Sequence, residues 1–164
     1  NIQDTESNRS IVRQAEEMVL NSGSSDALIR DSLLLDAAIL FAQGGDIEQS
    51  RQTLNLIVAD NLSDSFFVEY SLLGLELDIA RSQFIDAKRW SIDPRMVMLR
   101  ETPGINFSRR ILSLESDLSY ASGAIETSIK QLIQLSELFA DSNTLGQSSK
   151  KSTTHVIHNK LWRS

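Results

Sequence analysis

Apolar residues recur at intervals of three and four along most of the chain and rarely alternate with polar residues at every second position. A period of 3.6 residues places side chains on one face of an α-helix, whereas strict alternation is typical of a half-buried strand. The pattern therefore predicts an all-α protein. Helices are expected over residues 8–21, 24–42, 46–58, 63–80 and 84–90, and two more begin near residues 107 and 124.

Two of the predicted helices need neighbours on more than one side. Residues 33–41 are apolar almost all the way around the helix. The segment 63–80 carries two apolar ladders at helical spacing, one that begins at Phe66 and one that begins at Val68. Because each apolar face must be buried against a separate partner, we expect these two helices to be central and the more polar segment 46–58 to lie outside them.

Three turns between predicted helices have related sequences, at residues 44–50, 82–87 and 123–128. Aligning them places a small residue at one common position, at intervals of 37 and 41 residues: Ser50, Ala87 and Ser128. Tetratricopeptide repeats have a period of about 34 residues, and each hairpin buries its apolar side against the next one. We therefore predict antiparallel helical hairpins stacked as a tetratricopeptide-like right-handed solenoid, with a simple antiparallel bundle as the alternative.

The sequence predicts a single tetratricopeptide-like domain over residues 1–164. Both prolines of the chain, Pro94 and Pro103, fall in the segment 91–106, which is expected to be a long loop between hairpins because proline interrupts helices. The segment 141–154 is rich in Ser, Asn, Gln and Lys and is expected to be a flexible connection. A terminal helix is predicted over residues 155–162.

Composition narrows the classes of partner. The chain has 41% hydrophobic and 23% charged residues, which is typical of a soluble globular domain, and its net charge is −6. A net negative charge disfavours binding to nucleic acids or to anionic lipid headgroups. The absence of cysteine excludes disulfides and thiolate chemistry but does not indicate a compartment. Residues 1–6 do not resemble an export signal, so any such signal is expected upstream.

Catalytic, cofactor and metal sites are not expected. His155 and His158 are three residues apart, but two imidazoles without a nearby acid or cysteine are fewer ligands than a catalytic metal needs. The chain has no G-x-S-x-G elbow, no phosphate-binding glycine loop and no carboxylate pair tied to a cleft. Trp90 and Trp162 are interpreted as core residues rather than as interface anchors, and no protein-binding residue is assigned.

Three strings carry a resemblance to a known family: residues 72–87 (LLGLELDIARSQFIDA), residues 41–46 (FAQGGD) and residues 158–162 (HNKLW). These strings, in this order, resemble the N-terminal region of the LppC-type lipoproteins. The resemblance in sequence pattern extends over most of residues 10–164. These proteins activate penicillin-binding proteins from the outer membrane of Gram-negative bacteria.

The resemblance implies a noncatalytic role. In that family a helical, tetratricopeptide-like domain precedes a larger α/β part, and a lipidated cysteine tethers the protein to the periplasmic side of the outer membrane. The expected function is that of a spacer and docking platform that helps the lipoprotein to reach a bifunctional peptidoglycan synthase, a class A penicillin-binding protein. Peptidoglycan is a further candidate partner. This chain has no cysteine, so the lipid anchor is expected outside it.

The alternative function is a cytosolic tetratricopeptide adaptor that binds a peptide or a partner helix in its groove. In chaperone-type adaptors, Lys and Asn at the fifth and ninth positions of the first motif clamp a peptide carboxylate. The alignment places Leu35 and Ile39 there, so such a clamp is not expected. A helical enzyme is the third class, and it would be indicated by a bound metal or by an apolar pocket with converging titratable groups.

Overall fold

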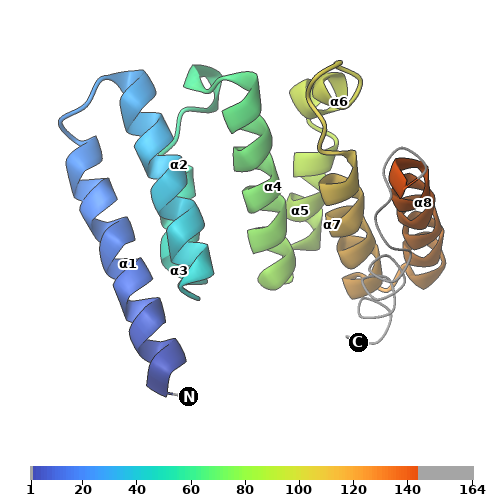
Figure 1. The fold of residues 1–164 in the computed structure, drawn as a ribbon, viewed down its shortest axis with the longest axis horizontal. Coiled ribbons are helices and arrows are strands. Elements are labelled where there is room, and N and C mark those ends of the chain that lie inside the picture. The colour runs from blue at the N-terminus through green and yellow to red at the C-terminus, as the bar shows by residue number, and fades with distance from the viewer. Residues whose placement is uncertain (1, 144–164) are drawn as a thin grey trace. The chain divides into compact units, whose positions relative to one another are not determined.

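The computed structural model describes residues 2–143 and is all-helical (Figure 1). The described residues form eight α-helices and one short 3-10 helix, and they contain no strand. The helices are α1 (Ile2–Ser22), α2 (Ala27–Gln43), α3 (Ile47–Asn55), α4 (Asp64–Ala80), α5 (Phe84–Ser91), α6 (Pro94–Arg100), α7 (Ser108–Ala121) and α8 (Ile125–Asn143), and the 3-10 helix η1 is Ala59–Asn61. The predicted terminal helix at 155–162 lies outside the described residues.

The chain divides into two compact units, Asn1–Ile105 and Asn106–Ser164, where the sequence predicts one domain over residues 1–164. The first unit contains α1 to α6, and the second contains α7 and α8. Periodicity predicts the helices of both units equally well, because it describes each helix by itself and does not report which helices share a core.

Three helices begin after a residue whose side chain caps the first turn. Asp26 accepts a hydrogen bond from the Ile29 amide at 3.1 Å, and Asp46 accepts one from the Gln49 amide at 3.1 Å. Ser63 caps α4 in the same way. A side-chain oxygen at this position satisfies an amide that the first helical turn leaves without a carbonyl partner.

The three predicted turns have the same backbone geometry. In each turn one residue has a positive φ, namely 84° at Gly45, 57° at Ser82 and 88° at Gly123. The next amide donates to the carbonyl five positions earlier: Asp46 to Phe41, Gln83 to Asp78 and Ala124 to Ser119, at 2.7–2.8 Å. This pair of features defines the Schellman motif that ends a helix and reverses the chain. The three hairpins α2–α3, α4–α5 and α7–α8 are therefore built on one turn.

The aligned small residues are buried inside the hairpins, as the alignment predicts. Ser50 and Ala87 are fully buried, and Ser128 is 3% exposed. Each serine hydroxyl donates to the carbonyl twelve positions earlier on the preceding helix, from Ser50 to Ala38 at 2.6 Å and from Ser128 to Ser116 at 3.0 Å. A larger side chain at this position would separate the two helices, because the interior has no spare volume.

The central positions of α2 and α4 are confirmed. Helix α2 packs against α1, α3 and α4, and α4 packs against α2, α3, α5 and α6; α1, α2 and α4 lie side by side in Figure 1. On α2, Phe41 and Ala37 meet Ala15 of α1 in one apolar cluster. Both ladders of α4 supply core residues, such as Leu72 and Leu77.

The prediction of a loop over residues 91–106 is wrong for its central part, which forms helix α6. Pro94 occupies the first turn of this helix, where proline has no amide to lose and its fixed φ suits the helix. The side chain of Asp93 caps the helix by accepting from the amides of Arg95 and Met96. Met96 and Leu99 are buried, so α6 contributes to the core of the first unit.

In the second unit, α7 and α8 form a hairpin around Leu112, Leu132 and Leu135. The guanidinium of Arg109 lies 4.8 Å from the centre of the Phe139 ring and donates to the Leu138 carbonyl. Helix α8 continues to Asn143, so the first residues of the predicted flexible connection at 141–154 are helical. The remainder of that connection lies outside the described residues.

Candidate functional site

The first unit contains a polar and aromatic cluster at the point where three helices meet. Arg51 comes from α3, Tyr70 and Asp78 come from α4, and Trp90 comes from α5. The Trp90 indole donates to Asp78 Oδ2 at 2.8 Å. The rings of Tyr70 and Trp90 pack edge to face, with their centroids 5.2 Å apart. We call Arg51, Tyr70, Asp78 and Trp90 the aromatic cluster.

Gly74 sets the position of the tryptophan. A Cβ atom added at Gly74 would lie 2.4 Å from two carbons of the Trp90 ring, which is closer than non-bonded atoms approach. The absence of a side chain at Gly74 therefore allows the indole to lie flat against α4 and to reach Asp78. Trp90 is half-buried, so the prediction of a core role describes only part of its surface.

Asp78 is fully buried and is held by two donors from other helices. Besides the Trp90 indole, Arg51 Nη1 lies 3.5 Å from Asp78 Oδ1. The Arg51 guanidinium also lies 5.7 Å from the centre of the Trp90 ring. An Asp buried without such partners would be strongly destabilising, so the pairing explains how α4 tolerates a buried carboxylate. Arg51 Nη1 finds no well-aligned hydrogen-bond acceptor among the described residues.

A cavity of about 320 Å³ opens beside the aromatic cluster. Its other lining residues are Ala59, Phe67, Asp86, Arg89 and Asp93. Burial raises the pKa of the Tyr70 hydroxyl; the Asp93 carboxylate also raises this pKa, and the Arg51 charge partly opposes both effects. The phenol therefore stays protonated at neutral pH and can donate a hydrogen bond to a bound group.

All three carboxylates of this cavity have partners within the protein. Asp78 is paired with Arg51 and Trp90, Asp86 lies 3.4 Å from Arg89, and Asp93 caps α6. A general base needs a carboxylate that can accept a substrate proton. The geometry instead suits noncovalent contacts with apolar, aromatic and hydrogen-bonding groups.

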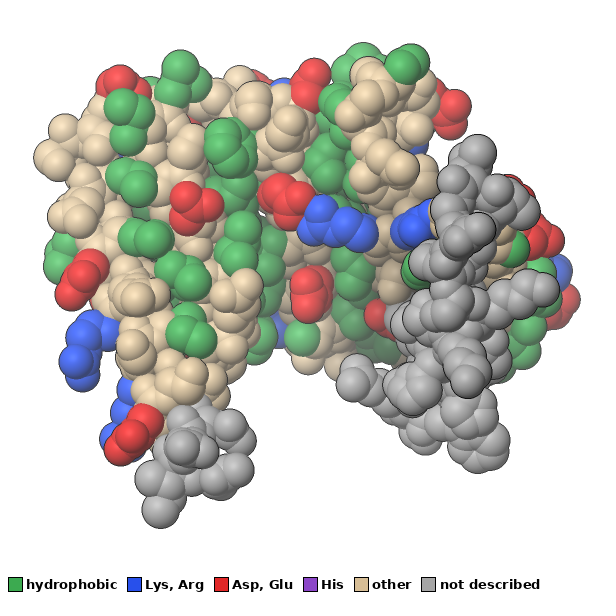
Figure 2. Space-filling view, in the orientation of Figure 1, with side chains coloured by type: hydrophobic (Ala, Val, Ile, Leu, Met, Phe, Trp, Pro, Cys, Tyr) green, Lys and Arg blue, Asp and Glu red, His purple; other side chains and the backbone are tan. Residues whose placement is uncertain are grey.

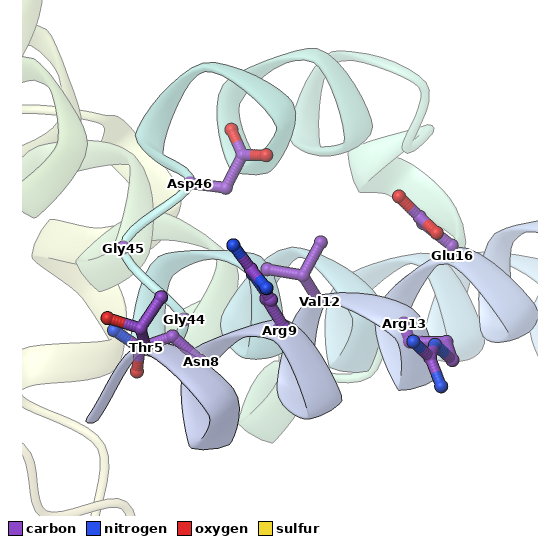
Figure 3. Close-up of a pocket in the computed structure, with 9 residues that line it drawn as sticks. All are labelled: Thr5, Asn8, Arg9, Val12, Arg13, Glu16, Gly44, Gly45 and Asp46. Carbon is purple, nitrogen blue, oxygen red and sulfur yellow. The ribbon is translucent and has the colours of Figure 1, made fainter. Parts of the chain in front are cut away.

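A second cavity, of about 580 Å³, lies between α1 and the α2–α3 turn (Figure 3). Arg9 and Val12 project from α1 toward this turn, whereas Arg13 points away from it. Gly44 permits this approach, because a Cβ there would lie 2.8 Å from Val12 Cγ2. Its lining includes two arginines but also Glu16 and Asp46, so positive and negative charges offset one another around the cavity. The nine lining residues are Thr5, Asn8, Arg9, Val12, Arg13, Glu16, Gly44, Gly45 and Asp46.

Leu35 and Ile39 occupy the positions where a chaperone-type adaptor has its carboxylate clamp. Leu35 is 1% exposed and belongs to the core, so it does not line an open groove. Ile39, which the alignment pairs with it, is half-buried. His155, His158 and Trp162 lie outside the described residues.

Charges of both signs are mixed on the surface of the described residues. On the part of the face in Figure 2 that grey atoms leave visible, Lys and Arg side chains lie scattered among Asp and Glu side chains. Within residues 2–143, no three His, Cys, Asp or Glu side chains lie together as metal ligands, and no helix is both long and apolar enough to cross a membrane. Comparison with protein-family models, curated proteins and solved structures finds no match to this chain.

Sequence reasoning did not find the aromatic cluster. One signal was available: Asp78 is the only charged residue among the buried positions of α4, and it follows directly after the apolar Leu77. Such a residue needs a buried partner. Nothing in the sequence indicates that Arg51, 27 positions earlier, supplies it.

Proposed function

We propose that this chain is a noncatalytic helical domain of an outer-membrane lipoprotein that activates a bifunctional penicillin-binding protein. It acts on the periplasmic side as a spacer and as a protein-interaction platform, and the lipid anchor lies outside the chain. The observation that carries the proposal is the repetition of one hairpin, with the same Schellman turn and the same buried small position at intervals of 37 and 41 residues.

The finer architecture that we propose is a tetratricopeptide-like right-handed solenoid. Two features support it. The small residues of each hairpin are twelve positions from their contact on the preceding helix, in both α2–α3 and α7–α8. Within the first unit, consecutive helices pack on one another, with α2 and α4 inside. Proteins built in this way present extended surfaces to partners, which suits a spacer and platform.

The chemistry of the cavities supports a noncatalytic role. The carboxylates beside the aromatic cluster are engaged in ion pairs and in a helix cap, and the second cavity mixes opposite charges. Tryptophan, tyrosine and arginine are the residues that most often dominate the energy of protein interfaces. We therefore assign the contact with the synthase to the cavity beside Trp90, Tyr70 and Arg51.

Binding of the purified chain to a detergent-solubilised class A penicillin-binding protein tests this function. We expect a dissociation constant in the micromolar range, which is about −8 kcal/mol. A monofunctional penicillin-binding protein serves as the comparison and is expected to bind at least tenfold more weakly, about 1.4 kcal/mol. Equal binding of both proteins, or of neither, would contradict the proposal.

A charge reversal at the rim of the cavity tests the assigned contact separately. Arg89→Glu changes a side chain that is 74% exposed, so it leaves the core intact. We expect it to weaken synthase binding, whereas Lys130→Glu, at a side chain that is 71% exposed in the second unit, leaves binding unchanged. If both variants bind like the unmodified chain, the function stands and the contact lies elsewhere. Selective binding of short peptides in place of the synthase would indicate the cytosolic adaptor.

A further inference from the structure

Three aromatic rings follow one another along the cavity beside the aromatic cluster. The ring centroids of Phe67 and Tyr70 lie 6.0 Å apart, and those of Tyr70 and Trp90 lie 5.2 Å apart. All three residues line the cavity. Aromatic rings pack edge to face or with offset stacking at centroid distances of about 4.5 to 7 Å. The wall of this cavity is therefore suited to a fourth ring.

The hydroxyl of Tyr70 is available to a bound group. Burial and the charges of Arg51 and Asp93 are the causes that shift its pKa, and a hydrogen bond to another described residue is not among them. The side chain is half-buried and lines the cavity. A protonated phenol of this kind can donate to an entering carbonyl oxygen.

The charges around the cavity favour an uncharged occupant. Asp78 is paired with Arg51, and Asp86 is paired with Arg89. Asp93 accepts from two amides at the start of α6. An entering carboxylate or ammonium group would lose its water without gaining an unpaired charge of opposite sign. A neutral ring has no such charge to desolvate.

We propose that this cavity binds one uncharged aromatic side chain of a protein partner, while a backbone carbonyl next to that side chain accepts a hydrogen bond from Tyr70. This occupant rests on the proposed function, which places the contact with the synthase at this cavity. The volume of about 320 Å³ lies at the lower end of the range of about 300–1,000 Å³ for small-ligand sites, so it fits a single side chain. Aromatic side chains that enter such pockets are frequent anchors of protein interfaces.

Four small probes test this chemistry without the synthase. N-acetyl-phenylalaninamide has the ring and the carbonyl groups and carries no charge. N-acetyl-alaninamide lacks the ring, N-acetyl-phenylalanine is an anion at pH 6, and phenylalaninamide is a cation at that pH. Titration of the full ¹⁵N-labelled chain is followed at the indole N–H resonance of Trp90, which Trp162→Phe assigns by removing the other tryptophan signal.

We expect N-acetyl-phenylalaninamide to bind in the millimolar range and about tenfold more tightly than each of the other three probes. Tyr70→Phe keeps the ring and removes the donor, so it is expected to weaken this binding about threefold to tenfold. Ala59→Leu places a larger side chain in the cavity lining and is expected to abolish it. The matched control is Val58→Leu, at a neighbouring position that is 48% exposed and outside the lining, and it is expected to bind like the unmodified chain.

Equal binding of the four probes, binding of none, or tighter binding of a charged probe would overturn the inference. Unchanged binding in both Ala59→Leu and Tyr70→Phe would overturn it as well, because the probe would then occupy another place. The probes contain no part of the synthase, so these results leave the proposed function to its own binding assay. Probe binding by a chain that does not bind the synthase would contradict the proposed function and support the aromatic preference of the cavity.

Discussion

Ala87 provides the most direct test of the hairpin alignment. It is fully buried on α5, and it occupies the position that Ser50 and Ser128 occupy in the other two hairpins. Each of those serines donates to a carbonyl twelve positions earlier. The corresponding carbonyl for position 87 is that of Leu75 on α4. Two substitutions at this position are expected to differ in their effect on stability, Ala87→Leu and Ala87→Ser.

The expected free energies of unfolding differ because the two side chains meet the same site differently. Leucine adds three carbon atoms where the alanine has no exposed surface, and overpacking of this kind costs about 1 to 3 kcal/mol. Serine adds one oxygen that can donate to the Leu75 carbonyl, a hydrogen bond worth about 0.5 to 1.5 kcal/mol net. The lower helix propensity of serine reduces the free energy of unfolding by about 0.5 kcal/mol. We therefore expect Ala87→Ser to remain within about 1 kcal/mol of the unmodified chain.

Urea unfolding followed by tryptophan fluorescence measures these differences. A Trp162→Phe background leaves Trp90 as the only tryptophan, and Trp90 reports on the α4–α5 contact through its bond to Asp78. With a urea dependence of about 2 kcal/mol per molar, Ala87→Leu lowers the midpoint by about 0.5 to 1.5 M. The matched control is Lys88→Leu, which introduces leucine at an exposed position of the same helix.

The alignment would be refuted by an unchanged midpoint for Ala87→Leu, or by equal losses for Ala87→Leu and Ala87→Ser. Either result would mean that position 87 does not face α4 closely. A loss of similar size in Lys88→Leu would show that leucine on α5 acts through something other than packing against α4.

Three further predictions concern single residues of the first unit. Ser82→Gly raises the free energy of unfolding by up to about 1 kcal/mol, since glycine adopts the φ of 57° without the strain that serine bears. Gly74→Ala lowers it by about 1 to 3 kcal/mol, because the new Cβ forces the Trp90 ring away from α4; both are measured by urea unfolding. Because burial raises the pKa of Tyr70, the folded state holds this proton more tightly than the unfolded state, and the stability gained is lost as pH rises above about 10. Phenolate absorbance against pH follows this titration, and Tyr70→Phe removes its high-pH component.

Each of these expectations has a matched comparison in the same chain. Gly45→Ser, which creates the strained arrangement that Ser82 already has, is expected to destabilise by about 1 kcal/mol, and a gain there would contradict the reasoning on φ. Gly23→Ala is expected to be tolerated, because the added Cβ would have its nearest neighbour at 3.7 Å. Tyr120→Phe should leave the high-pH phenolate component in place; if it removes that component, Tyr70 is not its source.

The candidate site was much less predictable than the helices. The sequence indicates Trp90 only as a core residue. Its partners Arg51 and Asp78 are 39 and 12 positions away, and no short motif connects them. The contact depends on Gly74, whose missing side chain is meaningful only once α5 lies against α4.

The sequence by itself determined the all-helical class, most of the helix ends and the hairpin turns of this protein. Asp26, Asp46 and Ser63 each accept a hydrogen bond from an amide three positions later. The hydrogen bond that closes the turn at Gly45 joins residues five positions apart. Because both interactions are local, a short stretch of sequence is enough to predict them. Pro94 is a residue for which the local sequence is not sufficient. Proline interrupts a helix that precedes it but also favours the first turn of a new helix. Here the cap at Asp93 and the burial of Met96 stabilise helix α6.

Tertiary structure alone decided the division into two units, the pairing of Arg51 with Asp78 and the exposure of Ile129 and Ile133 on α8. These three features depend on which helix faces pack together. Periodicity predicts which face of a helix is apolar, but not which other helix packs against that face. Ion pairs and cavities arise only between elements that packing has brought together, so their energies are absent from any local stretch of the chain.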